Sequence, residues 1–452
     1  MAQADLSKPG LKVKKLLCVT ANNRNKYYNM FEQPNGTFIA CYGRVDGNET
    51  QKTYPMSDWD STYRSKTTRK DEPYTDKTDL YIGEAKVVNG KKKVELFSAS
   101  RAAEAVSFIK DLMSHANASV QENYNVNVTA VTRQQVAAAQ AILDKLTTMA
   151  KPGQRIDDFN QLLTDLYMTI PRKMKNVKFH LFLNEDKITP ALLSRRGEAG
   201  SSKEDMNVGT GQGVNQLLQL EQDTLDVMAG QVNANKVEEA AEEAGKGGDL
   251  LSNLGLDCVP VTDPREIQMI KDKMDFNYNK MRGDEQSHRF IRAFRVNNEV
   301  SDSAFNKHIK EQDNKTKQLL WHGSRNENWW SIFQQSLKIR PTNAVITGKM
   351  FGYGIYFADK AKKSIGYTSG GYWAGGSSRG KGYLALYDIH QGVPYHVKRH
   401  QSEHSSLDWD KLRRYGKYDS LFAQGGADLV NNEYIVYKEQ QCTIRYIVEF
   451  KA

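Results

Sequence analysis

No stretch of the 452-residue sequence approaches the roughly 18 consecutive apolar residues that a membrane-spanning helix needs, so we expect neither an integral membrane protein nor a membrane partner. The first residues, MAQADLSKPGLKVKK, also lack the apolar core of a secretory signal. Hydrophobic residues make up 39% of the chain and aromatic residues 10%, which excludes disorder throughout. At roughly 150 residues per domain, the length suggests about three globular domains.

Cysteine is scarce, and its four residues form no CxxC or CxxH pair. They lie far apart, at Cys18, Cys41, Cys258 and Cys442. This spacing argues against a disulfide scaffold and against a structural zinc site, so we expect a reducing compartment and no metal. The chain also has no internal repeat and no GxxxxGK(S/T) loop of the kind that cradles nucleotide phosphates.

Positive charge is in excess, with a formal net charge of +9 and a pI near 9.0. Residues 1–100 carry a net charge of +5 and residues 296–452 carry +7, whereas residues 194–250 carry −6. One interpretation is two basic lobes separated by an acidic segment; the other is ordinary solvated faces. The balance favours polyanionic partners, nucleic acid above all.

Residues 1–115 are predicted to consist of strands and turns. The run KKLLCVT is a short apolar strand, and two β-rich runs flank Pro34-Asn35-Gly36, which predicts a hairpin. Aromatic side chains lie among Lys and Arg over residues 51–80. The run RAAEAVSFIKDLMSHA, residues 101–116, has helical spacing.

Residues 116–250 change to a helical pattern. Thr132-Arg133-Gln134-Gln135 has the Thr-x-x-Gln form of a capping box and precedes an Ala-rich run. The run FNQLLTDLYMTI continues the helical spacing as far as Pro171, and a further helix is expected after residue 213. Residues 194–213 are rich in Gly, Ser and acidic side chains, which predicts a flexible loop. We therefore expect a helical bundle with one long loop.

From about residue 251 the pattern is mixed and then mostly strand. The runs YLALYDI (383–389) and CTIRYIVEF (442–450) alternate as strands do. The Gly-rich segment 366–382 precedes the first of them. It is either a linker or a mobile wall of a binding site.

Three segments of this C-terminal part carry residues suited to chemistry. LLWHGSR contains His322, TGKMFGYGIYFADKAKKSIGYT contains Tyr356, Ser364 and Tyr367, and NNEYIVYKE contains Glu433. Taken singly, each has an ordinary structural explanation. His322 would be a hydrogen-bonded structural histidine, Tyr356 a core tyrosine and Glu433 a solvated glutamate at the start of a strand. Their combination resembles the H-Y-E signature of the poly(ADP-ribose) polymerase family over roughly residues 255–452.

Two upstream segments resemble other parts of the same family. The helical segment with YMTIPRKM resembles its helical regulatory domain, and NKYYNM with YGRV resembles its WGR domain, where Tyr42 stands in place of the usual Trp. The family's N-terminal zinc fingers are absent. The resemblance implies a multidomain α+β protein: a small β-rich WGR-like DNA-sensing domain (1–115), an all-α helical regulatory domain (116–250) and an α+β ADP-ribosyltransferase catalytic domain (251–452).

The resemblance implies NAD as substrate, and its nicotinamide–ribose bond would break through a transition state like an oxocarbenium ion. It makes His322, Tyr356 and Glu433 the catalytic residues: His322 bonds the adenosine ribose, Tyr356 sandwiches the nicotinamide with Tyr367, and Glu433 stabilises the cation and polarises the acceptor hydroxyl. The implied NAD-binding residues are His322, Gly323, Ser324, Arg340, Tyr356, Ser364 and Tyr367.

Several further residues of this part are implied to contact the acceptor or NAD, and the basic ones have a second interpretation. The resemblance puts Met350 and Lys363 on the acceptor side, but Lys363 also fits a group of three solvated lysines with Lys360 and Lys362. The run SLKIRPTNAV (336–345) resembles the donor-site loop of the family, which implies that Lys338 or Arg340 meets the pyrophosphate; the alternative is plain surface charge.

The WGR-like segment offers Tyr42 and Arg44 as DNA-binding residues, together with Lys12, Lys14 and Lys15 and the aromatic-basic stretch 59–70. Cations meet phosphates and aromatic rings stack on exposed bases, so this combination suits broken or nicked DNA without sequence preference. The alternative is a β domain with ordinary surface lysines.

These features predict DNA-break-stimulated poly(ADP-ribosyl)ation of the protein itself and of nearby acceptor proteins. A mono-ADP-ribosyltransferase is one alternative, although by the family pattern such enzymes often replace the residue at Glu433. A DNA-end-binding adaptor with a vestigial catalytic domain is another, and the intact His322, Tyr356 and Glu433 argue against it. We expect the nucleus in a eukaryote and the cytoplasm in a bacterium.

Overall fold

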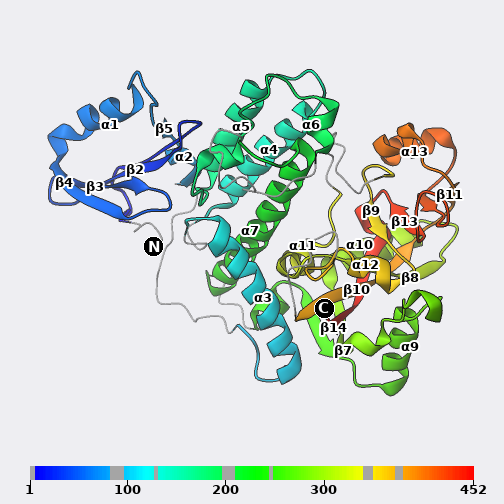
Figure 1. Ribbon diagram of the computed structural model, residues 1–452. Coiled ribbons are helices and arrows are strands. Elements are labelled where there is room, and N and C mark those ends of the chain that lie inside the picture. Colours follow the sequence, from blue (N-terminus) through cyan, green and yellow to red (C-terminus); the bar gives the residue numbers. More distant parts are fainter. Residues whose placement is uncertain are drawn as a thin grey trace. The chain divides into compact units, whose positions relative to one another are not determined.

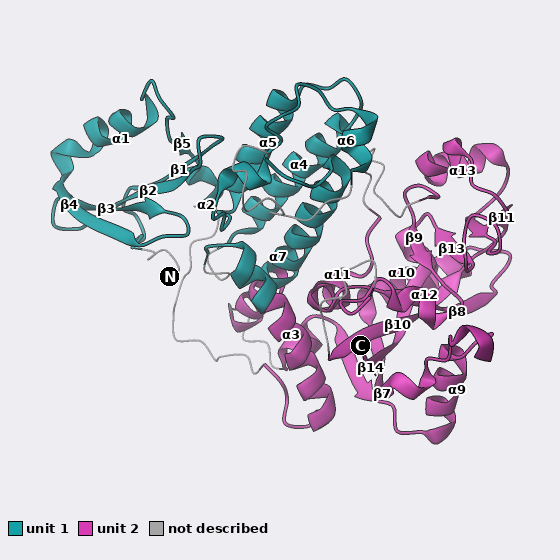
Figure 2. Cartoon of the chain, in the orientation of Figure 1, with its two compact units in different colours: residues 1–90, 118–232, 342–347 teal, residues 91–117, 233–341, 348–452 magenta. Residues whose placement is uncertain are grey.

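The computed structural model describes residues 6–81, 96–126, 131–195, 209–243, 248–339, 350–371 and 380–452 (Figure 1). The chain divides into two compact units (Figure 2). Unit 1 comprises residues 1–90, 118–232 and 342–347, and unit 2 comprises residues 91–117, 233–341 and 348–452. A helix at Ala103–Asn123 runs across the domain boundary expected at residue 115, and that boundary stays a prediction.

Unit 1 begins with an antiparallel sheet in the order β4-β3-β2-β1-β5. Its elements are β1 (Val13–Thr20), β2 (Arg24–Glu32), β3 (Thr37–Arg44), β4 (Glu49–Pro55), α1 (Trp59–Thr67), β5 (Thr75–Asp76) and α2 (Thr78–Tyr81). The predicted hairpin is confirmed: β2 pairs with β3, Thr37 donates to the Asn35 side chain, and Gly36 adopts a φ of +75°. Glycine tolerates this left-handed conformation, which the turn requires.

The expectation of strands and turns ahead of the helical run 101–116 is wrong for residues 59–67, which form α1. Trp59 is 6% exposed and meets Phe38 edge-on, with ring centroids 5.2 Å apart. The ring therefore belongs to the core of this sheet, with Leu16, Tyr28 and Met30. Burial of the indole against a distant strand stabilises a helix that its polar sequence did not indicate.

The remainder of unit 1 is helical. The helices of the middle region are α3 (Ala103–Asn123), α4 (Arg133–Met149), α5 (Ile156–Thr169), α6 (Pro190–Ser194) and α7 (Val214–Glu243), of which unit 1 holds α3 from residue 118 and α7 as far as residue 232. The capping box is confirmed, because Thr132 and Gln135 each accept from the other's backbone N–H at 3.0 Å. Inside this region Arg172 and Glu221 form a buried ion pair at 3.0 Å.

Unit 2 contains two sheets, in the orders β6-β7-β14-β10-β8 and β11-β12-β13-β9. Its strands are β6 (Leu256–Pro260), β7 (Phe290–Asn298), β8 (Lys317–Gly323), β9 (Ile355–Phe357), β10 (Lys381–His390), β11 (Pro394–Val397), β12 (Ser420–Ala423), β13 (Glu433–Val436) and β14 (Cys442–Lys451). Its further helices are α8 (Leu250–Asn253), α9 (Pro264–Met274), α10 (Glu299–Lys310), α11 (Trp329–Gln335), α12 (Ala361–Ile365) and α13 (Trp409–Tyr415).

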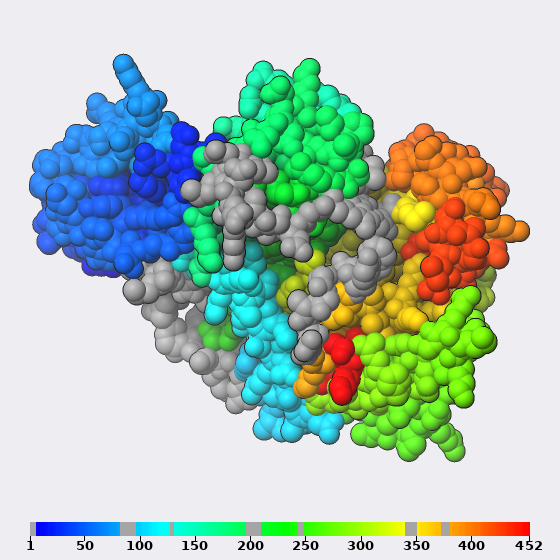
Figure 3. All heavy atoms as spheres, in the orientation of Figure 1, coloured from blue at the N-terminus to red at the C-terminus, as the bar shows by residue number. Residues whose placement is uncertain are grey.

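Both strands expected from the C-terminal runs are confirmed, and they pair with each other as antiparallel β10 and β14. The two strands are neighbours inside the five-stranded sheet β6-β7-β14-β10-β8. The buried core packed on this sheet includes Trp321, Leu384 and Val448. The first half of α3 also joins unit 2, since Phe108 stacks on Phe294 with ring centroids 4.4 Å apart. Figure 3 shows α9 and the turn that follows it, in yellow-green, at the surface of unit 2.

No helix in the described ranges combines the length and the apolarity that crossing a membrane requires.

Candidate active site and N-terminal pocket

The two sheets of unit 2 join where β8 passes the end of β9. Trp321 and Ala358 exchange backbone hydrogen bonds of 2.8 and 2.9 Å there, forming an isolated antiparallel bridge. The bridge brings His322, on β8, next to Tyr356, on β9. Tyr356 in turn pairs across the sheet with Ile435 of β13, the strand that starts at Glu433. The three residues singled out from the sequence therefore converge on one junction.

The His322 imidazole is held in one tautomer. Its Nδ1 lies 3.0 Å from the carbonyl oxygen of Tyr356, and because a carbonyl only accepts, Nδ1 carries the proton. Trp329, Phe357 and Tyr387 surround the ring, with centroids 5.6 to 6.3 Å away. Burial lowers the pKa of His322, which the Tyr356 carbonyl partly opposes. The neutral ring therefore presents Nε2 as a hydrogen-bond acceptor.

The Glu433 carboxylate is buried at 5% exposure and paired with one cation. Lys363 Nζ lies 2.6 Å from Glu433 Oε1 and also donates to the carbonyl oxygens of Asn431 and Asn432 at 3.3 and 3.5 Å. The pKa of Lys363 lies below its ordinary value, because burial lowers it by more than the negative charge of Glu433 raises it. The second oxygen, Glu433 Oε2, is buried without a hydrogen-bond partner among the described residues.

This pair argues against one of the two interpretations of Lys363, and its place on the acceptor side stays a prediction. Its side chain is 14% exposed and lies against Glu433, so it is not a solvated surface lysine. Lys360 pairs with Asp284 at 3.6 Å, and Lys362 is exposed. The three lysines of this segment therefore have three different environments.

Gly323 and Ser364 are in direct backbone contact. A Cβ atom on Gly323 would lie 2.0 Å from the carbonyl oxygen of Ser364, a separation that only glycine allows. Ser364 belongs to α12 and is 4% exposed. The end of β8 and helix α12 thus lie too close together for any side chain at position 323.

The two tyrosines differ in their constraints. The Tyr356 hydroxyl donates to the Gly352 carbonyl at 2.9 Å and accepts from the Phe351 N–H at 3.0 Å, which fixes the ring. Tyr367 follows α12 and is 39% exposed. Burial of its hydroxyl and the nearby charge of Glu433 raise the pKa of Tyr367 to about 12. Burial, together with Glu433 and Tyr367, also raises the pKa of Tyr356, so all three groups belong to one electrostatic environment.

The remaining expected residues lie around this centre. Ser324 follows β8 and accepts from the Asn328 side chain at 3.1 Å, and Met350 packs against the core that includes Phe351. Lys338 forms an exposed ion pair with Glu439 at 2.9 Å, consistent with a surface role. Arg340 and residues 372–379 of the Gly-rich segment 366–382 lie outside the described residues.

Sequence reasoning missed two residues of this site. Asp359 accepts a 2.7 Å hydrogen bond from the Asn432 side chain, next to Glu433. Both residues lie inside the segments that resemble the family, but no spacing rule connects positions 73 apart. Among the described residues, no three His, Cys, Asp or Glu side chains are grouped to hold a metal ion.

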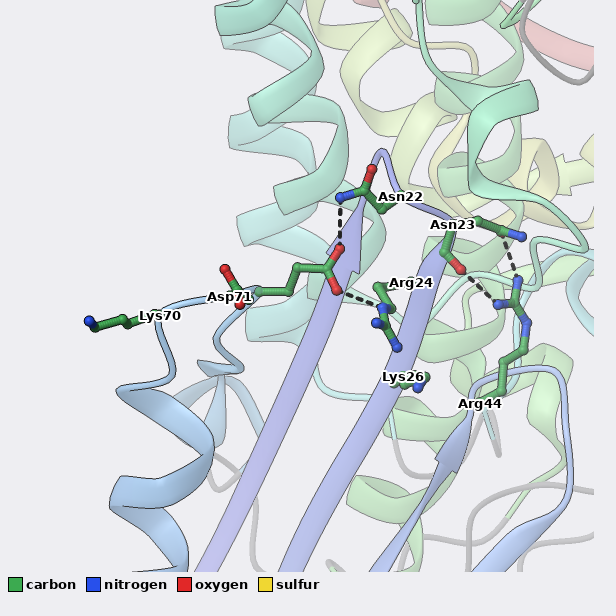
Figure 4. A pocket seen from close by; sticks show the side chains of 8 residues that line it. Asn22, Asn23, Arg24, Lys26, Arg44, Lys70 and Asp71 are labelled. Carbon is green, nitrogen blue, oxygen red and sulfur yellow. Dashed lines mark hydrogen bonds and ion pairs between the residues drawn. The ribbon is translucent and has the colours of Figure 1, made fainter.

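A second feature, in unit 1, is a cavity of about 750 Å³ in the β-rich part, beside the turn between β1 and β2 (Figure 4). Its lining is formed by Asn22, Asn23, Arg24, Lys26, Arg44, Lys70, Asp71 and Glu72. Four cations thus face two carboxylates. Glu72 pairs with Arg24 at 2.5 Å, whereas the side chains of Lys26 and Lys70 have no hydrogen-bond or ion-pair partner in the described ranges. The cavity therefore has unneutralised positive charge.

Both residues that the sequence singled out for DNA have partners within unit 1. The Arg44 guanidinium donates to the carbonyl oxygens of Asn23, Met174 and Lys175 at 2.9 to 3.0 Å and pairs with Asp46 at 2.7 Å. Arg44 thereby ties β3 to the segment after α5, a role that the sequence did not reveal. The Tyr42 ring stacks on another ring, that of Tyr28, with centroids 5.2 Å apart. Contact of either residue with DNA stays a prediction.

Comparison with known proteins agrees with the geometry of unit 2. Residues 264–452 match the model of the poly(ADP-ribose) polymerase catalytic domain. An uncharacterised protein of Invertebrate iridescent virus 6, 101L, is 35% identical over 164 residues, which are 36% of this chain and 65% of the viral protein. Poly [ADP-ribose] polymerase 2 of Zea mays is 30% identical over 218 residues, 43% of this chain and 32% of the plant protein. The chain thus spans less than two thirds of either relative.

The family model does not match the first 263 residues, so it does not identify the β-rich part or the helical middle region. A second protein of the same virus, the poly [ADP-ribose] polymerase-like protein 100L, is 32% identical over 161 residues, 35% of this chain and 84% of the viral protein. Because the match covers most of that relative and the family model includes the strands that bear His322, Tyr356 and Glu433, the chain belongs to the poly(ADP-ribose) polymerase family through its C-terminal catalytic domain.

Proposed function

We propose that the protein is an NAD-dependent ADP-ribosyltransferase that releases nicotinamide and builds poly(ADP-ribose) on itself and on nearby proteins. The observation that carries this proposal is the Glu433 carboxylate, with Oε1 held by Lys363 and Oε2 buried without a partner among the described residues. A buried acceptor without a donor is costly, so a ligand hydroxyl that donates to Oε2 would stabilise both.

The reaction needs such a carboxylate. The bond between ribose C1′ and the nicotinamide nitrogen breaks, and its electron pair leaves with nicotinamide. An acceptor hydroxyl oxygen then bonds to C1′, and its proton passes through the Glu433 carboxylate to water. Glu433 would bond a ribose hydroxyl, stabilise the developing positive charge and polarise the acceptor hydroxyl, while Lys363 holds the carboxylate in its orientation.

The other residues of the junction would hold NAD. Neutral His322 offers Nε2 to a hydroxyl of the adenosine ribose. The family resemblance assigns the nicotinamide amide to Gly323 and to the Ser364 hydroxyl, and β8 and α12, which carry these residues, approach each other closely. Tyr356 and Tyr367 would enclose the ring by stacking.

Polymer formation is favoured over single transfer because Glu433 is present and paired. In the family pattern, enzymes that transfer one unit often replace this residue. The intact ion pair and the fixed His322 tautomer also disfavour a DNA-end adaptor with a vestigial catalytic centre.

Stimulation by DNA breaks is a second proposal, supported by the cavity in unit 1. Lys26 and Lys70 lack neutralising partners in the described ranges and line the cavity with Arg24 and Asn22, so its chemistry suits the phosphates of broken or nicked DNA. The resemblance of this part to the WGR domain points the same way. The helical middle region, by its own resemblance, would restrain the catalytic domain until DNA binds.

Labelled NAD tests these proposals together. The full-length protein is incubated with NAD, with and without nicked DNA, and the products are separated by size. A ladder that grows with DNA supports both proposals. A single labelled band indicates a mono-transferase, and no labelled product with intact DNA binding indicates an adaptor. A ladder that is independent of DNA would refute the DNA proposal alone.

A further inference from the structure

One carboxylate holds the residues on both sides of Glu433. Asp359 Oδ2 accepts from the Asn432 side chain at 2.7 Å and from the Tyr434 hydroxyl at 3.4 Å. Successive side chains of a strand point to opposite faces, so fixing Asn432 and Tyr434 also fixes the direction in which Glu433 points.

Asp359 also lies four residues before Lys363, the cation paired with Glu433. The segment from Ala358 to Ile365 thus supplies an acceptor for the neighbours of Glu433 and a donor for its carboxylate. The negative charge of Asp359 favours the protonated amine of Lys363, as Glu433 does, against the burial that disfavours it. Two carboxylates therefore stabilise one buried ammonium group.

The position of Asp359 is itself fixed by its neighbours. Ala358 is 2% exposed and exchanges backbone hydrogen bonds with Trp321, the residue before His322. Asn432 is held from its other end as well, because its Oδ1 accepts from the Gly425 N–H at 2.9 Å. Asp359 Oδ1 is buried without a partner in the described ranges, so the carboxylate bears a desolvation cost that a purely structural hydrogen bond does not require.

We infer that Asp359 is a positioning residue for the ADP-ribosyl transfer: it orients Glu433 through Asn432 and Tyr434 and supports the charge of Lys363. This inference rests on the proposed function, since it names what holds the proposed catalytic carboxylate in place. The groups that face Lys363 are Glu433 from β13 and Asp359 from the turn before α12. Tyr356 and Tyr367 face Glu433 and are neutral at ordinary pH because their pKa values are raised.

Three full-length variants separate charge from hydrogen bonding. Asp359→Asn keeps an acceptor for Asn432 and removes the charge, and Tyr434→Phe removes the 3.4 Å bond and keeps the charge. Asp388→Asn is the matched control, because that carboxylate pairs with Arg445 elsewhere in the same unit. Thermal unfolding verifies that each variant is folded.

For Asp359→Asn we expect kcat for nicotinamide release to fall about tenfold to a hundredfold, with less than about a twofold change in KM. The alkaline limb of its pH profile should shift to lower pH, because Lys363 loses a charge that raises its pKa. Tyr434→Phe should lower kcat without shifting the limb, and Asp388→Asn should resemble the wild type. An Asp359→Asn variant with wild-type kcat, or with an unmoved alkaline limb, would overturn the inference.

A readout without catalysis keeps this test separate from the proposed function. Only the neutral amine of a lysine reacts with acetic anhydride, so the pH dependence of Lys363 acetylation, followed by mass spectrometry, reports its pKa. We expect Asp359→Asn to shift that dependence to lower pH whether or not the wild type releases nicotinamide. An inactive wild type refutes the proposed function, whereas unchanged Lys363 labelling refutes the role of Asp359.

Discussion

Trp321 and Ala358 exchange two backbone hydrogen bonds, of 2.8 and 2.9 Å, and this bridge links the two sheets of unit 2. His322 follows Trp321 directly, and Tyr356 lies two residues before Ala358. The spacing of these two proposed catalytic residues therefore depends on backbone pairing, which side-chain substitutions leave largely intact. Variants of the site should report chemistry more than misfolding.

The close approach of Gly323 to Ser364 predicts a large effect from one methyl group. In Gly323→Ala the new Cβ would lie 2.0 Å from a carbonyl oxygen, so β8 and α12 must separate. We expect the free energy of unfolding to fall by about 1–3 kcal/mol and the affinity for a non-hydrolysable NAD analogue to fall at least about tenfold. Chemical denaturation and calorimetry measure the two effects. Unchanged stability and affinity would mean that the contact is looser than described.

The neutral state of His322 predicts the acid limb of NAD binding. Burial lowers the pKa of His322 below its ordinary value of 6.5, so Nε2 stays an acceptor down to about pH 6.5 and is protonated only below it. Affinity for the NAD analogue, measured by calorimetry, should be flat above pH 6.5 and fall below it. His322→Asn should bind weakly without this limb, and the exposed His396→Asn should retain it. A loss of affinity beginning above pH 7 would contradict a lowered pKa.

The cavity of the β-rich part predicts a charge-dependent interaction with DNA. Lys26→Glu with Lys70→Glu should weaken binding of nicked DNA and reduce the slope of log affinity against log salt by about 2, one for each phosphate that a lysine no longer neutralises. Fluorescence anisotropy at several salt concentrations measures this slope. The control is Lys307→Glu with Lys310→Glu, two exposed lysines of α10. If both double variants bind alike, the effect is general electrostatics and the cavity is not the DNA site.

The buried pair of Arg172 and Glu221 predicts how the helical region contributes to control. Glu221→Ala leaves Arg172 unpaired at 7% exposure, which should cost about 3–5 kcal/mol of stability. The exposed pair of Arg155 and Asp157 is the control, and Asp157→Ala should cost about 1 kcal/mol or less. If the region restrains catalysis, Glu221→Ala should also label itself from NAD without DNA.

The opposite result has a clear meaning. A Glu221→Ala protein that is destabilised, binds an NAD analogue and stays inactive without DNA would show that the helical region is a support and not a restraint. A point variant is preferable to the isolated fragment 251–452, because Phe108 stacks on Phe294 and contacts Tyr383. That fragment would expose both rings to water.

Features set by neighbouring residues could be predicted from the sequence. The hairpin at Asn35-Gly36 and the capping box of Thr132 and Gln135 each depend on contacts within a few positions. Long strands such as β14 were indicated by their alternation. Helix α1 was not, because its stability comes from Trp59 packing on a strand 21 positions earlier.

The same distinction applies to the candidate site. His322 and Glu433 were found because their surrounding motifs resemble a family. The hydrogen bond of Asp359 to Asn432 joins positions 73 apart, and that of Arg44 to the Met174 carbonyl joins positions 130 apart. Contacts of this kind are fixed by the tertiary fold and leave no periodic signal in the sequence. The charge of each residue could be read from the sequence, but not its partner.

We propose that the buried carboxylate of Glu433 stabilises the developing cation and polarises the acceptor hydroxyl during the transfer. Glu433→Gln keeps the size of the side chain and removes its charge, and Glu403→Gln, at an exposed position, is the control. The measurement is polymer formed from labelled NAD by the full-length protein with nicked DNA, alongside affinity for an NAD analogue. We predict that Glu433→Gln lowers polymer formation at least about a hundredfold while the affinity persists. Long chains made by Glu433→Gln at the wild-type rate would contradict the account.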